Sequence, residues 1–235
     1  MKTKTQSHGL TVFIVASLVA CLSILTLSVY SPNIPESILW QRQLVAAAFV
    51  AICLAGGSAA LSPKKCAAAF ETHGFQRSSE KENNTSSLVI KGHHPDCERY
   101  LTHTVLLGKT TYCSACLGLF AGAFLGSIAV AGYFLFEAGN AGSSFPFAIL
   151  GQACLTMGFL QFKLKSQLRL FANIALVLGA TLSLIGMDEQ MKNAFVDLLV
   201  MGAALVWIAT RISISQWDHS RICSQCGFTC RAERK

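Results

Sequence analysis

Charged side chains are scarce in this chain. Asp, Glu, Lys and Arg make up 13% of its 235 residues, whereas 52% are apolar. About a quarter of the residues in soluble domains are charged, so the low charged fraction disfavours a soluble globular fold. The composition instead indicates an integral membrane protein.

Several motifs that would indicate nucleotide binding or a catalytic activity are absent. The sequence contains no glycine-rich nucleotide loop, no Gly-x-Ser-x-Gly elbow and no His-Glu-x-x-His pair. A net charge of +7 could suggest nucleic acid, but the basic residues stand in short stretches between apolar runs, without interleaved aromatics. We therefore expect no nucleic-acid partner, assign no catalytic residue and favour a protein that is not an enzyme.

Six apolar runs divide the chain. Each approaches the roughly 20 residues with which a helix crosses the hydrocarbon layer, and none alternates as barrel strands do. The runs cover residues 10–30, 44–61, 116–136, 145–162, 168–187 and 194–214. The predicted fold is an all-α integral membrane protein with about six transmembrane helices. The fourth run is the shortest and contains Gln152, so its full passage through the bilayer stays open.

The distribution of basic residues predicts the orientation. In a six-span topology, all but two of the 19 Lys and Arg residues fall on one side; the exceptions are Arg42 and Lys192. The positive-inside rule then places both termini in the cytoplasm and the protein in the cell membrane, with the lipid bilayer as its first partner. The expected parts are two spans in 1–61, a cytoplasmic loop in 62–112, four spans in 113–214 and a cytoplasmic tail in 215–235.

The spans offer packing groups and few charges. Gly118, Gly122 and Gly126 recur every four residues, a spacing that predicts close helix packing. No ionisable residue stands at mid-span depth, and Asp197, in the first turn of the last span, is expected at the membrane interface. This pattern weighs against a coupled transporter.

Six of the ten cysteines form two groups on the predicted cytoplasmic side. The first comprises Cys97, Cys113 and Cys116 with His103, and the second comprises Cys223, Cys226 and Cys230 with His219. In a reducing compartment such spacings favour metal over disulfides, and a Cys-x-x-Cys turn suits tetrahedral Zn²⁺. Two separate sites are compatible with these spacings. A single crossed site, made by Cys113, Cys116, Cys223 and Cys226, is equally compatible.

The first group also resembles a known pattern. Cys97, Gly108, Cys113, Cys116, Gly118 and Gly122 stand in the order found in a prokaryotic family of polytopic membrane proteins, a domain of unknown function, in which a Cys-x-x-Cys pair enters a membrane helix. Glu98 and Ala115 depart from the histidine and arginine of that pattern. The resemblance implies a multi-span protein with a metal site, whose fourth ligand would be His94 or His103.

Three functions fit these observations. The leading one is a polytopic membrane protein with a small cytoplasmic Cys/His module, stapled by zinc, that serves assembly or binds another membrane or cytoplasmic protein. Such a polar loop and short tail bury little apolar area, and zinc contributes roughly 10–16 kcal/mol of apparent binding energy in small modules. The alternatives are a redox protein with an iron–sulfur cluster or dithiol, and a metal-gated transporter or channel.

Overall fold

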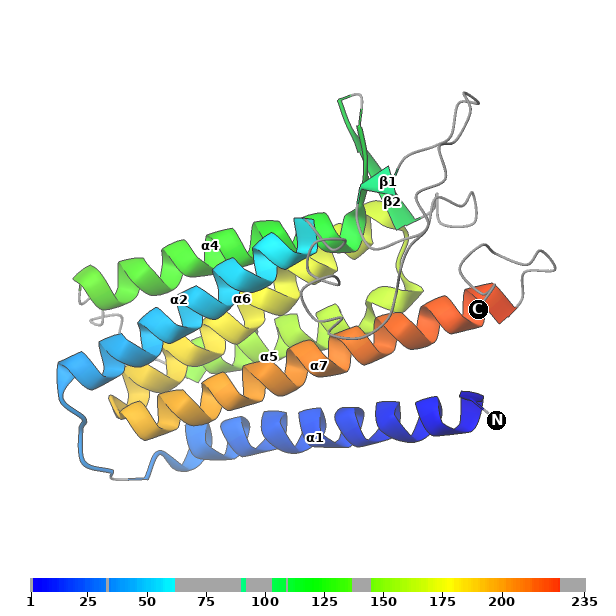
Figure 1. Cartoon of the computed structure of the whole chain (residues 1–235). Coiled ribbons are helices and arrows are strands. Elements are labelled where there is room, and N and C mark those ends of the chain that lie inside the picture. Colours follow the sequence, from blue (N-terminus) through cyan, green and yellow to red (C-terminus); the bar gives the residue numbers. More distant parts are fainter. Residues whose placement is uncertain are drawn as a thin grey trace, which may run out of the picture.

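A computed structural model describes residues 2–32, 34–61, 90–91, 103–108, 110–136 and 145–224 of the chain. Six long helices dominate these residues (Figure 1). They are α1 (Lys2–Tyr30), α2 (Leu39–Leu61), α4 (Ser114–Phe136), α5 (Phe145–Phe159), α6 (Ser166–Met191) and α7 (Ala194–Ser224). A short 3-10 helix, η2 (Leu160–Lys163), follows α5.

The six helices lie side by side in one bundle, and each is long and apolar enough to cross a membrane. The candidate spans range from 19 residues, in Phe145–Lys163, to 29 residues, in Ala194–Ile222. Large apolar side chains such as Leu18 and Phe171 are exposed on the outside of the bundle, where lipid would cover them. The chain is therefore an integral membrane protein, as its composition predicts.

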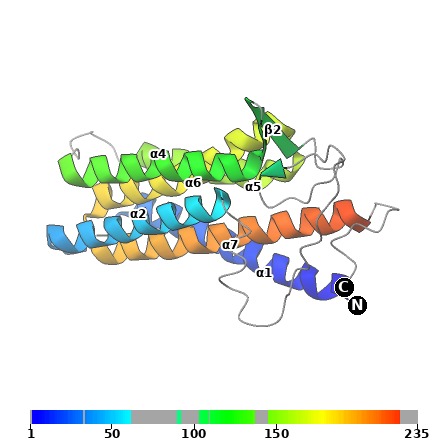
Figure 2. The same ribbon diagram turned by 45° about the horizontal axis from the view of Figure 1, so that its top comes forward.

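The two ends of the bundle differ in what they carry. Both chain termini and a small sheet lie at one end, which we call the cysteine end (Figures 1 and 2). At the other end the chain passes from α1 to α2 and from α6 to α7. We call this the acidic end, because Asp188, Glu189 and Asp197 lie there. The compartment that each end faces stays a prediction.

Close packing of α4 against α6 confirms the role expected of the spaced glycines. A Cβ atom on Gly118 would strike the backbone carbonyl oxygen of Leu170, and one on Gly122 would lie 3.1 Å from the Cα atom of Ile174. Only glycine permits backbones to approach so closely. This contact fixes the start of α4, and with it the Cys-x-x-Cys pair, against α6.

Polar side chains join α5 to α6. The amide nitrogen of Gln152 donates a hydrogen bond to the Ser183 hydroxyl over 3.1 Å. Together with η2, α5 forms a 19-residue candidate span, so the fourth apolar run is long enough to cross. The core nearby is apolar and includes Leu155, Leu184 and Trp207, all almost completely buried.

A three-stranded sheet at the cysteine end was not predicted from the sequence. Its strands are β1 (Ile90–Lys91), β2 (Thr104–Leu107) and β3 (Thr110–Cys113), with β3 in the middle. The antiparallel β2–β3 pair runs from Thr104 opposite Cys113 to Leu107 opposite Thr110. Gly108 has φ of 63° in the two-residue loop, a conformation that favours glycine. This hairpin delivers the chain to α4 without a linker.

Candidate functional site

The Cys-x-x-Cys pair occupies the junction between sheet and membrane helix. Cys113 is the last residue of β3, and Cys116 lies in the first turn of α4. Both are buried, with 0% and 6% of their surface exposed. The Ser114 hydroxyl donates a hydrogen bond to the backbone carbonyl of His103 over 2.8 Å, which ties the hairpin to the helix.

The two thiols contact each other. A hydrogen bond with Cys116, followed by burial, raises the pKa of the Cys113 thiol above its ordinary value. A protonated pair in this position would give up its protons when a cation takes their place, because metal ligands are thiolates. The first turn of a helix also stabilises negative charge. The geometry therefore suits a cation bound between two sulfur atoms.

A buried arginine of α7 stands beside these thiols. Arg211 is 6% exposed, and its guanidinium lies near enough to Cys113 and Cys116 to interact with them electrostatically. Its Nε atom donates to the Asn173 amide oxygen over 3.2 Å, while its Nη2 atom has no hydrogen-bond partner among the described residues. A fixed positive charge here favours thiolates, whose complexes with Zn²⁺ carry negative charge when three or four cysteines bind.

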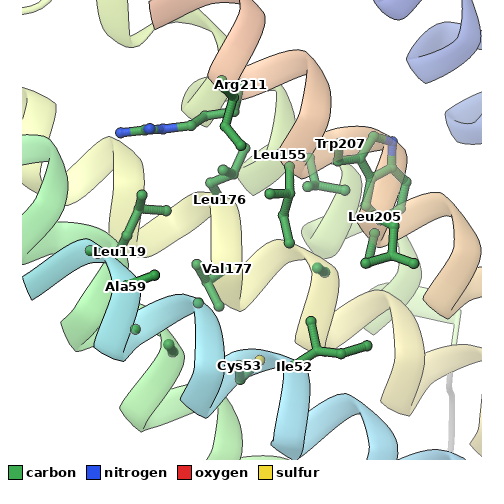
Figure 3. Close-up of a pocket in the computed structure, with 18 of the residues that line it drawn as sticks. Ile52, Cys53, Ala59, Leu119, Leu155, Leu176, Val177, Leu205, Trp207 and Arg211 are labelled. Carbon is green, nitrogen blue, oxygen red and sulfur yellow. The ribbon is translucent and has the colours of Figure 1, made fainter. Parts of the chain in front are cut away.

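An apolar cavity of about 410 Å³ opens next to the pair (Figure 3). It lies among α2, α4, α6 and α7, and its apolar lining includes Ile52, Leu119 and Trp207. Cys116 and Arg211 contribute to its wall. Cys116 thus borders an apolar space inside the bundle, whereas Cys113 does not line it.

A chain of buried polar contacts links the hairpin, α6 and α7. Arg169 of α6 lies 3.1 Å from the His103 Nδ1 atom through Nη1 and 3.3 Å from Asp218 Oδ2 through Nη2. An arginine can only donate, so His103 Nδ1 accepts, and the proton of a neutral ring sits on Nε2. Arg221 also pairs with Asp218, over 3.0 Å. In this arrangement His103 orients Arg169.

The other predicted ligands lie partly beyond the part of the chain that the structure describes. Cys97, Cys226, Cys230 and His94 fall on residues outside it. His219 and Cys223 belong to the last turns of α7, at the cysteine end, but their side chains are not described. Across the described ranges no three His, Cys, Asp or Glu side chains converge as a metal site would need. The full ligand set stays a prediction.

The helix α7 also extends beyond the expected span. It continues to Ser224, so the first ten residues of the segment assigned to the tail are helical. Near the end of this helix, Asp218 forms ion pairs with both Arg169 and Arg221. This extension places the end of α7, which includes Cys223, at the cysteine end of the bundle (Figure 1).

The sequence did not predict the surroundings of one residue of the acidic end. Asp197 lies in the first turn of α7, as expected, and its place at the membrane interface stays a prediction, but its side chain is completely buried. Asp188 is also buried and forms a bidentate ion pair with Arg42. The charge pattern could have indicated this ion pair, because Arg42 is one of only two basic residues on that side of the predicted topology.

Comparison with known proteins gives no relative: no family model, no curated protein and no solved structure matches the chain. The resemblance of the Cys-x-x-Cys segment to a membrane-protein family therefore stays a prediction.

Proposed function

We propose that this polytopic membrane protein uses Cys113 and Cys116 as two of the ligands of a structural zinc ion. The zinc module would serve assembly of the bundle or binding of a partner protein. The observation that carries the proposal is the buried thiol pair at the start of a membrane helix, with the Nη2 atom of Arg211, which has no hydrogen-bond partner among the described residues, nearby. A buried cation of this kind is expected beside a site that carries negative charge.

The remaining ligands would come from the loop or the tail. Cys223 is the penultimate residue of α7, and Cys226 follows the end of that helix by two residues. A site shared by the two Cys-x-x-Cys pairs would clasp the end of α7 to the start of α4. Such a clasp would add to the Arg169–Asp218 ion pair that joins α6 to this part of α7, which supports the assembly role.

Two observations favour a structural site over thiol redox chemistry. Cys113 and Cys116 are buried, whereas exchange with a soluble dithiol requires an accessible sulfur atom. Arg169 and Asp218 add a buried ion pair that holds α6 and α7 together near the same junction. Structural zinc sites are closed, with every coordination position taken by protein, so buried thiols suit such a site.

The hairpin supplies a surface for a partner. Leu106 and Leu107 of β2 are both largely exposed beyond the membrane bundle. Exposed apolar side chains on a small, rigid hairpin are typical of contact sites between proteins. A metal site at the base of the hairpin would fix its direction relative to α4.

The test compares two double variants in detergent. We expect Cys113→Ser/Cys116→Ser to lose bound zinc and unfold at a lower temperature than the wild type. The matched control is Cys53→Ser/Cys154→Ser, which changes two described cysteines within spans and should keep its zinc. Undiminished zinc in the first variant would overturn the assignment of these two cysteines.

A further inference from the structure

Ionisable side chains from four helices meet at the acidic end of the bundle. Arg42 comes from the first turn of α2 and Tyr133 from the last turns of α4. Asp188 and Glu189 come from the end of α6, and Asp197 from the first turn of α7. Nothing in the cysteine site involves these residues, because they lie at the opposite end of the helices.

Asp188 is the best satisfied acid of the group. The Arg42 Nε atom donates to Asp188 Oδ1 over 2.6 Å, and Arg42 Nη2 donates to Asp188 Oδ2. The Tyr133 hydroxyl lies 2.8 Å from Asp188 Oδ2 and 2.8 Å from Glu189 Oε2. A tyrosine carries one hydroxyl proton, so a single hydrogen serves two carboxyl groups.

Asp197 has no such donors. Its side chain is 0% exposed, and neither carboxyl oxygen accepts a hydrogen bond from any described residue. The Asp188 carboxyl lies close enough for the two groups to repel each other when both are charged. Arg42, whose guanidinium is the one near both acids among the described residues, is engaged by Asp188. A buried carboxylate without donor or counter-charge is strongly unfavourable, above all within a membrane bundle.

Counting protons resolves this conflict. Three carboxyl groups face one arginine and one tyrosine hydroxyl, so the cluster is short of positive charge and of hydrogen-bond donors. Two carboxyl groups in contact commonly share one proton, because both cannot be ionised at once. A protonated Asp197 would supply the missing hydrogen and would bring the Asp188–Asp197–Arg42 group to zero net charge.

We propose that Asp188 and Asp197 form a proton-binding carboxyl pair, with Asp197 as the group that takes up the proton. A proton fits better than a metal ion, because no three acidic, His or Cys side chains in the described ranges converge as metal ligands. The charged groups that face Asp197 are Asp188 from α6 and Arg42 from α2. Tyr133 of α4 contacts Asp188 and also donates to Glu189 of α6. The neighbouring turns of α1 and α5 carry no charged residue.

Loss of the proton would have a mechanical consequence. Two carboxylates would then stand against one guanidinium beside the short connection from α6 to α7. Because Asp197 is buried in α7 and Asp188 in α6, relief of this repulsion requires the side chains to move or water to enter. Proton uptake would therefore stabilise the packing of α6 and α7 at this end of the bundle.

Infrared spectroscopy of the full chain in lipid nanodiscs tests the assignment. A protonated carboxyl group absorbs above the amide region, and the band shifts in deuterated water. We expect such a band at neutral pH in the wild type, and we expect aspartate labelled with ¹³C in its carboxyl group to shift it. Labelled glutamate should leave it in place. This comparison uses the native chain, so it holds even if a variant fails to fold.

Variants assign the band to one residue. Asp197→Asn keeps the shape of the protonated acid and should lose the band while it unfolds at the wild-type temperature. The matched control, Asp218→Asn, changes a buried aspartate at the other end and should keep the band. No band at neutral pH, or a band that survives in Asp197→Asn, would overturn the proposal.

A second arm separates a proton from a metal cation. Sodium or calcium chloride is added at constant ionic strength, and thermal unfolding of the wild type and of Asp197→Asn is compared. We expect no difference between the two proteins. Stabilisation by either cation in the wild type alone would assign the site to that cation and would overturn the proton assignment.

Discussion

One added methyl group on α4 tests how closely this helix packs against α6. In Gly118→Ala the new Cβ atom would meet the carbonyl oxygen of Leu170 and would lie 2.9 Å from the Cβ atom of Asn173. The first of these atoms belongs to the backbone of α6, so it cannot rotate away. The two helices must separate, and overpacking of this kind costs about 1–3 kcal/mol.

The same helix offers a matched control. A Cβ atom added at Gly132 would meet no described atom within 4 Å. Gly132→Ala should therefore show only the gain in helix propensity, about 0.5–1 kcal/mol. Gly122→Ala should lie between the two variants, because its Cβ atom would be 3.0 Å from Val177 Cβ and 3.1 Å from Ile174 Cα.

The assay is thermal unfolding of the three purified variants in one detergent. Both variants gain helix propensity, so the overpacking cost alone separates Gly118→Ala from Gly132→Ala, by about 1–3 kcal/mol in unfolding free energy. For a chain of this size that difference corresponds to several degrees in unfolding temperature, about 2–4 °C for each kcal/mol. The reasoning fails if Gly118→Ala unfolds at or above the temperature of Gly132→Ala.

Three further predictions concern the rest of the bundle. Arg42→Met leaves the Asp188 carboxylate buried without its cation, so the free energy of unfolding should fall by about 3–5 kcal/mol, measured by thermal unfolding. An unfolding temperature equal to that of the wild type would contradict the ion pair. Thr210→Val removes a 2.6 Å hydroxyl contact with Ser17 between α1 and α7 and should cost about 1 kcal/mol in the same assay. Reporters fused to the N- and C-termini should both respond as cytoplasmic, and a periplasmic response from either would refute the predicted orientation.

The sequence predicts the six helices because the thickness of the membrane sets their length and composition. The sequence predicts the ends of the helices less well. The second run was expected from residue 44, but α2 begins at Leu39 and includes Arg42. Gln41 and Arg42 lower the hydropathy of that turn, and the partner of Arg42 is Asp188, 146 positions away, which no local pattern reports.

The sequence predicts which residues form the site but not which side chains they contact. The Cys-x-x-Cys spacing identifies Cys113 and Cys116, because the two ligands are neighbours in sequence. His103 was predicted as a ligand on spacing alone, yet its Nδ1 atom faces Arg169, which lies 66 positions away. Contacts of this range depend on how α4, α6 and α7 pack, and no periodicity in one segment reports them.

Metal analysis of the wild-type chain, purified under anaerobic conditions, tests the central claim most directly. The account predicts a colourless protein with bound zinc: one zinc ion per chain for a crossed site, or two for separate sites. A metal-free protein would contradict the zinc staple. A brown protein that contains iron and absorbs visible light would replace it with an iron–sulfur cluster.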